Sequence, residues 1–114
     1  MTLREKFFPF LRANRITNTS EFNAMYSQGK GKTVGPLLIH RKKNELGRTR
    51  LGLSVPKKVG NAVQRNRVKR KCREAFRLTM QFLPIGTDIL ITVRPHATME
   101  LEEYKELILK GVSC

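Results

Sequence analysis

Alternating apolar and polar positions predict three β-strands in this sequence. The first, residues 37–41, begins with a run of three apolar side chains, whereas residues 50–55 and 87–93 place apolar side chains at every second position. The polar stretch 42–49 contains Asn and Gly and predicts a turn, so we expect the first two strands to pair with each other. Residues 29–35, which are rich in Gly and Lys, predict a further turn.

Apolar positions spaced three or four residues apart predict two short helices. The first begins with a cap at Thr19 or Ser20 and ends before Gly29. The second begins after a cap at Thr98 and ends near Lys110, with acidic side chains in its first turn, where the helix dipole favours them. Its core-facing side chains are expected to be Leu101, Tyr104 and Ile108.

A third, much longer helix lies between these two. It opens at Asn61 and reaches about Leu83, where Pro84 and Gly86 end it. Its apolar stripe follows the spacing of a core-facing helix and consists of Val68, Cys72, Ala75, Phe76, Thr79 and Leu83.

Strand, long helix and strand together make a βαβ unit, which predicts an α+β two-layer sandwich with helices against one sheet. The 114 residues suffice for one domain, which we expect to span residues 1–114. Residues 1–17 are basic and irregular, and we expect them to form an extended N-terminal segment.

The charge of the chain changes this picture, because it is strongly positive and unevenly placed. Lys and Arg number 23 against 9 Asp and Glu, which gives a net charge of +14. Four of the nine acids lie in residues 100–114, so the basic character belongs to the rest of the chain. A merely solubilised surface would mix both signs, whereas this composition is typical of proteins that bind nucleic acids.

The long helix carries the densest charge. From Lys57 to Arg73 there are eight basic residues and no acid, and the first acid is Glu74. An ordinary solvated helix face would interleave Glu with Lys and Arg at spacings of four residues. On a helical wheel of 100° per residue, one group of polar side chains falls within an arc of roughly 60° opposite the apolar stripe. These are Asn66, Arg70, Arg73 and Arg77.

Such a helix suits phosphate binding. Guanidinium groups pair with two phosphate oxygens at once, and a rigid helix holds several of them at fixed spacing. Asn61, Gln64 and Asn66 add neutral donors, and the helix start exposes backbone N–H groups that can bind an anion. Arg65 points closer to the apolar stripe and avoids burial because it lies in the first turn.

The helix alone does not separate RNA from DNA. Phe22 and Tyr26 share a face of the first helix at a spacing of four residues. Exposed aromatic side chains on a basic surface suit stacking on single-stranded bases, and packing in the core is an equally good explanation of this spacing.

Other chemistries find little support in the sequence. Cys72 and Cys114 are far apart and lack metal-ligand spacing, so neither a zinc site nor a disulfide is indicated, and Cys72 is expected to be a packed thiol. A nuclease acting without RNA would need clustered acids or histidines, yet Asp88 is the only Asp and the two histidines lie apart. No apolar run is long enough to span a bilayer, and residues 7–11 do not read as a signal peptide.

The stretch from Leu51 to Arg77 contains an ordered set of short motifs. They are Gly52-Leu53-Ser54-Val55, Lys57-Lys58, Gly60-Asn61-Ala62-Val63, Arg65-Asn66-Arg67 and Arg73-Glu74-Ala75-Phe76-Arg77. In this order they resemble the protein subunit of bacterial ribonuclease P. Weaker similarity extends to Asn14-Arg15-Ile16, Ser20-Glu21-Phe22 and Val93-Arg94-Pro95, so the resemblance covers nearly the whole chain.

The resemblance implies a cytoplasmic protein that assists an RNA enzyme. Ribonuclease P is an endoribonuclease that removes the 5′ leader from precursor tRNA, and its catalytic RNA binds, with the substrate, the Mg²⁺ used for hydrolysis. The implied partners are the ribonuclease P RNA and precursor tRNA, with no membrane and no obligate protein partner, and the protein itself is expected to have no catalytic residue and no metal ligand. The implied fold has the element order α-β-β-β-α-β-α and a left-handed βαβ crossover, as in a ribosomal protein domain, whereas general statistics favour a right-handed crossover.

The resemblance also assigns residues to two surfaces. The residues implied in binding the catalytic RNA are Lys57, Lys58, Asn61, Arg65, Asn66, Arg67, Lys69, Arg70 and Arg73. Those implied in binding the tRNA leader, in a cleft between the sheet and the first helix, are Arg15, Phe22, Tyr26 and His40. His40 stands where relatives often have an aromatic side chain. A structural ribosomal protein would be equally basic, and the Arg65-Asn66-Arg67 motif after Gly60-Asn61 distinguishes the two possibilities.

Overall fold

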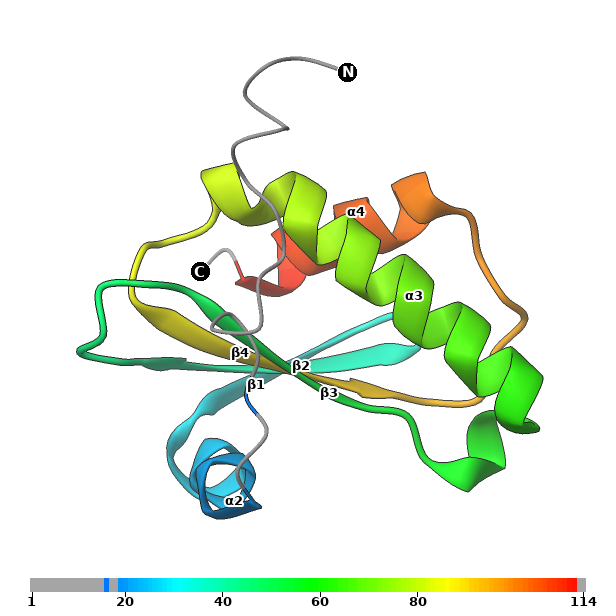
Figure 1. Cartoon of the computed structure of the whole chain (residues 1–114), viewed down its shortest axis with the longest axis horizontal. Coiled ribbons are helices and arrows are strands. Elements are labelled where there is room, and N and C mark those ends of the chain that lie inside the picture. Colours follow the sequence, from blue (N-terminus) through cyan, green and yellow to red (C-terminus); the bar gives the residue numbers. More distant parts are fainter. Residues whose placement is uncertain (1–15, 17–18, 113–114) are drawn as a thin grey trace.

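The computed structural model describes residues 16 and 19–112 and shows a four-stranded sheet with helices on both faces (Figure 1). Helix α3 (Ala62–Thr79) and helix α4 (Leu101–Val112) lie side by side on one face. The shorter helix α2 (Thr19–Gln28) lies on the opposite face. The predicted α+β class is confirmed, and the predicted bounds of all three helices are close to those observed.

The sheet is mixed. Its strands are β1 (Lys30–Val34), β2 (Leu37–Lys43), β3 (Arg50–Ser54) and β4 (Thr87–Val93), in the order β1-β2-β4-β3. β1 pairs antiparallel with β2, β2 pairs antiparallel with β4, and β3 lies parallel to β4 at the edge.

The predicted pairing of the strands at residues 37–41 and 50–55 is wrong, because β4 lies between them. The burial of β4 explains this order: six of its seven residues are buried, and Leu90 is as fully buried as Ile89 and Ile91. A strand that is apolar on both faces gains most from a central position, covered by α3 and α4 on one side and by α2 on the other.

Residues 30–34 form a strand where a turn was predicted. All but the last residue of β1 are exposed, so the strand has no apolar alternation that the sequence could reveal. β1 lies at an edge of the sheet, where Lys30 and Lys32 discourage pairing with other molecules.

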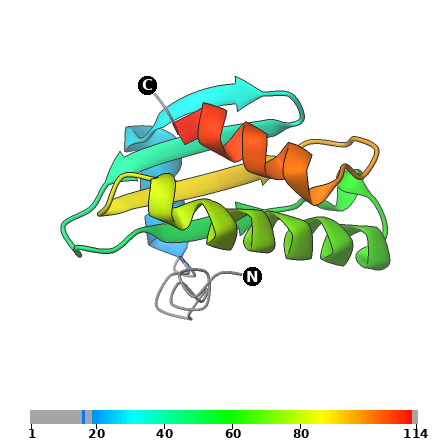
Figure 2. The ribbon, with the colours of Figure 1, turned by 90° about the horizontal axis from the view of Figure 1, so that it is seen from above.

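The connection from β3 through α3 to β4 is left-handed, as the resemblance implied (Figure 2). In Figure 2 the helices lie in front of the sheet, β3 and β4 both run from left to right, and β4 lies above β3, which is the left-handed arrangement. This is the uncommon hand for parallel neighbours. It places the start of α3 beyond the carboxyl end of β3 and returns the chain to the middle of the sheet.

The core lies between the sheet and the pair of helices α3 and α4. The predicted stripe of α3 is buried throughout, and a 3₁₀ turn at Met80–Phe82 completes the helix before Leu83. Cys72 is fully buried, so the expectation of a packed thiol is confirmed, and this burial raises the pKa of the thiol to about 12. Helix α4 begins at Leu101, later than the expected cap at Thr98, and buries Tyr104 and Ile108 as predicted.

Helix α2 is tied to the sheet by a cluster of charges around Arg50. The Arg50 guanidinium donates to both carboxylate oxygens of Asp88 on β4, at 2.8 and 2.7 Å, and also to Glu21 on α2. Asn44 donates a further hydrogen bond of 2.7 Å to Asp88. Burial alone would raise the pKa of Asp88, but the hydrogen bonds from Arg50 and Asn44 outweigh it and hold the pKa below its usual range.

Beyond β3, the backbone N–H of Ile16 donates a 2.8 Å hydrogen bond to the carbonyl of Leu51. The Ile16 side chain is buried. The chain before helix α2 therefore contacts the free edge of β3 at this residue.

Replacing Arg50 with Met should lower the free energy of unfolding by about 3 kcal/mol, because it leaves the buried Asp88 carboxylate without its bidentate partner. Urea denaturation followed by circular dichroism measures this. The matched control is Lys105→Met, since Lys105 forms only an exposed ion pair with Glu102 and should contribute less than about 0.5 kcal/mol. Equal effects of the two substitutions would contradict an anchoring role for Arg50.

Candidate nucleic-acid interface

Helix α3 begins with a capping box that fixes the position of its basic side chains. The Asn61 side-chain oxygen accepts from the Gln64 backbone N–H, and the Gln64 side-chain oxygen accepts from the Asn61 backbone N–H, both at 2.9 Å. Two backbone N–H groups that we expected to face an anion are therefore bonded within the protein. The side-chain amide nitrogens of Asn61 and Gln64 are not used by the cap and remain donors.

The basic side chains expected to bind the catalytic RNA spread along α3 and the 3₁₀ turn before it, Lys57–Val59. Lys57, Lys58, Arg67 and Arg70 are exposed, as are Asn61 and Asn66. Lys69 and Arg73 are half-buried. The helical wheel therefore placed Asn66 and Arg70 correctly on the solvent side of α3, whereas Arg73 and Arg77 of the same arc are only partly exposed.

Arg65 and Arg77 differ from the other basic residues of this helix. Arg65 is half-buried, and its Nε is buried with no hydrogen-bond partner among the described residues. Arg77 pairs with Glu74 one turn earlier, which neutralises part of its charge. The Arg65 side chain as a whole is still partly exposed, so its charge can be felt by an anion at the start of α3.

A shallow hollow of about 760 Å³ lies between α3 and the start of α4. Its lining combines Arg67, Arg70 and Lys71 of α3 with Glu74 and Leu101. Lys71 is held in place by a 2.9 Å hydrogen bond from its Nζ to the Met99 carbonyl. Three cations against one carboxylate give this hollow a positive potential suited to a phosphate backbone.

The residues predicted to contact the leader lie on the opposite face of the sheet, beside α2. The Tyr26 hydroxyl is 3.0 Å from the Thr92 hydroxyl of β4, and its ring meets the His40 ring edge-on with centroids 5.2 Å apart. Phe22 is half-buried against β3 and β4. We call this group of Phe22, Tyr26, His40 and Thr92 the aromatic cleft.

Two glycines allow these rings to approach the sheet. A Cβ at Gly52 would lie 3.2 Å from the Phe22 ring, and a Cβ at Gly31 would lie 3.0 Å from the His40 ring. Such contacts are tighter than ordinary side-chain packing permits, so larger residues at these positions would displace the rings. Tyr26 keeps 46% of its surface exposed, which leaves its ring open to a stacking partner.

His40 is neutral in this environment. Burial lowers its pKa, and its Nδ1 is buried with no hydrogen-bond partner among the described residues. A neutral imidazole offers one donor, one acceptor and an aromatic face, which favours contact with a base over pairing with a phosphate.

The structure thus brings Phe22, Tyr26 and His40 together and keeps them apart from α3. The two predicted surfaces lie on opposite faces of one sheet. Arg15, the remaining residue predicted to contact the leader, lies outside the described residues, as do residues 7–11.

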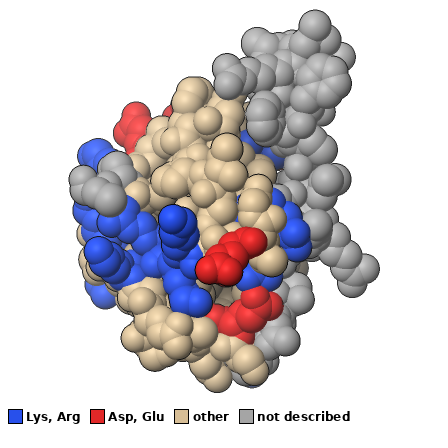
Figure 3. Space-filling view, turned by 90° about the vertical axis from the view of Figure 1, so that its left-hand side faces the viewer, with Lys and Arg blue, Asp and Glu red and all other residues tan. Residues whose placement is uncertain are grey.

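Sequence reasoning missed two features of this interface. Thr92 was not recognised as the partner of Tyr26, although its position between buried neighbours on β4 places it on the α2 face. A second basic cluster, Lys30, Arg41, Lys42 and Lys43, gathers at the end of β2 (Figure 3). The unbroken run Arg41-Lys42-Lys43 was the sequence signal for it.

Within residues 16 and 19–112, no group of three or more His, Cys, Asp or Glu side chains is arranged to hold a metal ion. None of the helices formed by these residues is long and apolar enough to cross a membrane.

Comparison with known proteins gives a consistent result. The family model for ribonuclease P matches residues 10–112. The ribonuclease P protein component of Staphylococcus epidermidis is 40% identical over 104 residues, covering 87% of this chain and 90% of that protein. The component of Bacillus cereus is 37% identical over 100 residues, covering 86% and 87% respectively.

Solved structures agree. The ribonuclease P protein of Staphylococcus aureus superposes with a TM-score of 0.77 at 30% identity, covering 88% of this chain and 93% of that one. The protein from Thermotoga maritima superposes with a TM-score of 0.76 at 28% identity, covering 84% and 92% respectively.

The lowered pKa of His40 predicts a pH-dependent stability. Because the folded state binds a proton less readily than the unfolded chain, the contribution of neutral His40 is fully present above about pH 6.5 and is lost as the pH falls through the folded-state pKa. We expect the free energy of unfolding to decrease from pH 7 to pH 5, and His40→Phe to remove much of this decrease. Urea titrations at several pH values measure it.

The control for this experiment is His96→Gln, which leaves His40 and its neighbours intact and should retain the decrease. If His40→Phe and the wild type lost stability equally over this pH range, the neutral state of His40 would be refuted.

Proposed function

The chain belongs to the ribonuclease P protein family, and from this membership we propose that it uses its two surfaces for two RNAs. Helix α3 and the turn before it bind the catalytic RNA, and the aromatic cleft holds the 5′ leader of precursor tRNA. Membership itself gives the broader role, because a ribonuclease P protein component takes part in processing tRNA 5′ ends within an endoribonuclease holoenzyme.

The one-sided charge of α3 is the observation that carries this proposal. Eight basic residues and no acid lie between Lys57 and Arg73, and six of the eight are on α3, whose opposite stripe is buried in the core. The rigid backbone holds the exposed cations at fixed spacing, so they can match successive phosphates of a folded RNA without much loss of entropy on binding.

The composition of the aromatic cleft supports a single-stranded ligand. An exposed tyrosine ring, a neutral histidine and a half-buried phenylalanine offer stacking surfaces and few charges. Duplex RNA hides its base faces, whereas a leader without a pairing partner can splay its bases onto such rings. Stacking reads no particular sequence, which suits a protein that must accept leaders of many precursors.

We assign the chemistry to the RNA subunit. In this proposal, Mg²⁺ is bound by the catalytic RNA and the substrate, whose phosphate oxygens are the ligands that this ion prefers. The protein contributes by neutralising backbone charge and by positioning the leader, in the cytoplasm, where tRNA matures. A purely structural ribosomal role is disfavoured by the match of residues 10–112 to the ribonuclease P family.

A reconstitution tests the proposal. The protein alone should not cleave precursor tRNA, and adding it to a bacterial ribonuclease P RNA should restore cleavage at Mg²⁺ concentrations too low for the RNA alone. Binding of the catalytic RNA should weaken steeply with salt. For Arg65→Ala/Arg67→Ala, the slope of log affinity against log salt should fall by about 1.5, since two phosphate contacts are lost.

The control with the same change in charge is Lys105→Ala/Lys110→Ala on α4, which should leave the slope unchanged. Leader removal by purified, RNA-free protein would overturn the assignment of chemistry to the RNA. An equal slope change in both double variants would mean that net charge, not the α3 face, governs binding.

The aromatic cleft gives a second prediction, on substrate selectivity. With the holoenzyme, Phe22→Ala should raise the dissociation constant for leader-bearing tRNA about tenfold, because one stacked base is lost. The dissociation constant for mature tRNA should not change. Phe22→Leu keeps an apolar contact with the sheet but removes the aromatic face, so it should show the same selective loss. Equal weakening for both tRNAs would instead indicate a folding defect.

A further inference from the structure

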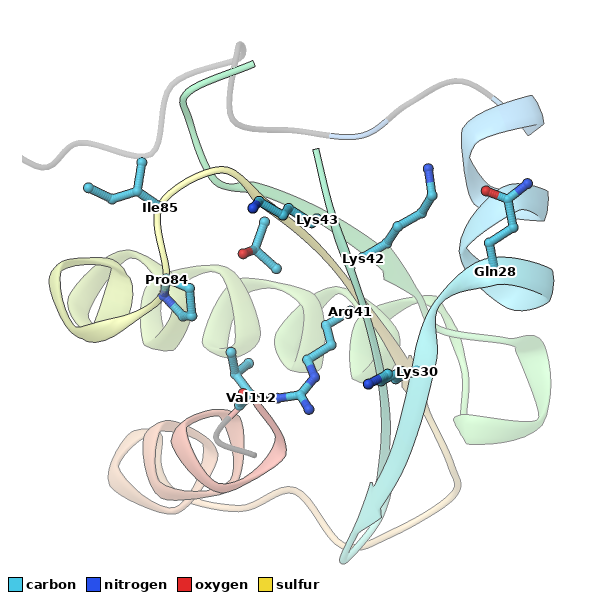
Figure 4. Close-up of a pocket in the computed structure, with 9 residues that line it drawn as sticks. Gln28, Lys30, Arg41, Lys42, Lys43, Pro84, Ile85 and Val112 are labelled. Atoms are coloured by element: carbon cyan, nitrogen blue, oxygen red, sulfur yellow. Dashed lines mark hydrogen bonds between the residues drawn. The ribbon is translucent and has the colours of Figure 1, made fainter. Parts of the chain in front are cut away.

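The layer of helices ends before the sheet beneath it does. Helices α3 and α4 lie side by side and run in the same direction, so both end over the part of the sheet where β2 finishes and β4 begins (Figure 2). There the uncovered sheet forms the floor of a pocket of about 420 Å³ (Figure 4). Its walls include Val112 at the end of α4 and Pro84 and Ile85 in the turn before β4. We call it the end pocket.

Three basic side chains of the end pocket project from the helical face of the sheet. Arg41 lies on this face, because its guanidinium donates to the Val112 carbonyl of α4. Lys43 follows Arg41 by two residues, and Lys30 pairs with Arg41 across the strands, so both lie on the same face. Lys42 points to the opposite face, toward α2 (Figure 4). The end pocket is therefore separate from the aromatic cleft.

Two of these three charges are uncompensated. The Arg41 guanidinium is used at the carboxyl end of α4, where the helix dipole also favours a cation. Lys30 and Lys43 are exposed, and neither forms an ion pair with any of residues 16 and 19–112. Figure 3 shows Lys and Arg side chains gathered on this end of the molecule. Their combined potential favours an anionic group over the floor of the pocket.

Exposed apolar side chains surround the same end of the molecule. Three of the six large apolar side chains that are exposed among the described residues belong to it: Leu46, Phe82 and Ile85. The turns that carry them are bonded together, because the Asn44 backbone N–H donates to the Gly86 carbonyl at 2.7 Å and the Thr49 hydroxyl to the Pro84 carbonyl at 2.8 Å. Single exposed apolar residues are common, whereas several on neighbouring turns are typical of a contact with another protein.

The aliphatic wall distinguishes the end pocket from the two RNA surfaces. Unpaired bases stack on aromatic rings and on guanidinium planes, and Ile85, which is 82% exposed, offers neither. The position of the pocket differs as well. The 18 residues of α3 span about 27 Å, so the pocket lies far from the capping box, and it opens on the face of the sheet opposite to the aromatic cleft. A protein segment can present carboxylates and apolar side chains together, which is the chemistry that this pocket matches.

We propose that the end pocket docks an acidic segment of another protein that also carries apolar side chains. Carboxylates of the segment lie over Lys30 and Lys43, and an apolar side chain packs against Pro84 and Ile85. Since neither RNA surface takes part, such a partner binds the ribonucleoprotein as well as the free protein. The proposal goes beyond the proposed function and adds a third surface to the two that serve RNA.

The test uses two short fluorescein-labelled peptides with the same charge, built of Glu-Glu-Leu and of Glu-Glu-Ser repeats. Fluorescence anisotropy with the full-length protein should show binding of the first peptide and much weaker binding of the second. Ile85→Ser should raise the dissociation constant of the Glu-Glu-Leu peptide about fivefold, because an apolar contact is lost without any change in charge. The matched control is Val63→Ser, which removes another exposed apolar side chain at the start of α3 and should bind as the wild type.

The charges are tested in the same way. Lys30→Ala/Lys43→Ala should raise the dissociation constant of the Glu-Glu-Leu peptide about tenfold. Lys57→Ala/Lys58→Ala removes the same charge from the turn before α3 and should leave peptide binding unchanged at physiological salt, where distant charges are screened. All the replaced side chains are exposed, so the variants should fold as the wild type, which circular dichroism checks.

Three results would overturn the proposal. If the Glu-Glu-Leu peptide failed to bind, no acidic apolar segment would fit the pocket. If the two peptides bound equally, or Ile85→Ser had no effect, the pocket would attract only negative charge. If Lys30→Ala/Lys43→Ala weakened binding of the catalytic RNA, or this RNA displaced the peptide, the surface would belong to RNA. The proposed function fails or stands separately, because the salt slope of Arg65→Ala/Arg67→Ala is measured without any peptide.

Discussion

The burial of β4 on both of its faces is the constraint on which the rest of this structure depends. A strand that is apolar on both faces must lie between two layers, and this forces β2 and β3 to its two sides and helices onto both faces of the sheet. The same constraint separates the RNA surfaces. Because α3 covers one face of β4 and α2 the other, the basic helix and the aromatic cleft lie on opposite faces of the sheet. An RNA on α3 and a leader in the cleft can therefore be held at the same time without competing for one surface.

Electrostatics divides the same two surfaces by chemistry. The α3 face relies on guanidinium and ammonium groups, so its attraction for RNA is long-ranged and sensitive to salt. The aromatic cleft relies on stacking against its rings, and burial keeps its histidine neutral. Stacking is short-ranged, so it acts only when a base touches the ring. Arg50 links the two halves mechanically, since it joins β3, β4 and α2 through Asp88 and Glu21. The position of the cleft wall is thus set by the strand that leads into α3.

Much of this could be predicted from the sequence, and the failures have physical causes. Helix α3 and strand β4 were predicted nearly to the residue, because their burial leaves a strong periodic pattern and Asn61 supplies a recognisable cap. Strand β1 left no trace in the residue pattern, because an exposed edge strand has no apolar alternation, and only the element order implied by the resemblance, with three strands before the long helix, anticipated it. The predicted pairing of β2 with β3 was wrong because strands that are neighbours in sequence often form a hairpin. Here β4 lies between them, since Leu90 on its second face must also be buried, and that need arises from the packing of the whole fold. The network around Arg50 joins residues that are 29 and 38 positions apart, which no local pattern encodes. The left-handed crossover followed only from the family resemblance.

The hydrogen bond between Ile16 and Leu51 has a consequence that concerns self-association. A mixed sheet with β1 and β3 at its borders exposes two rows of backbone groups to other molecules. At the edge strand β1, Lys30 and Lys32 repel the same strand of a second copy of the chain. At the edge strand β3, the backbone N–H of Ile16 already bonds the carbonyl of Leu51. Ile16 thus occupies one of the backbone groups through which the β3 edge could pair with a strand of another molecule.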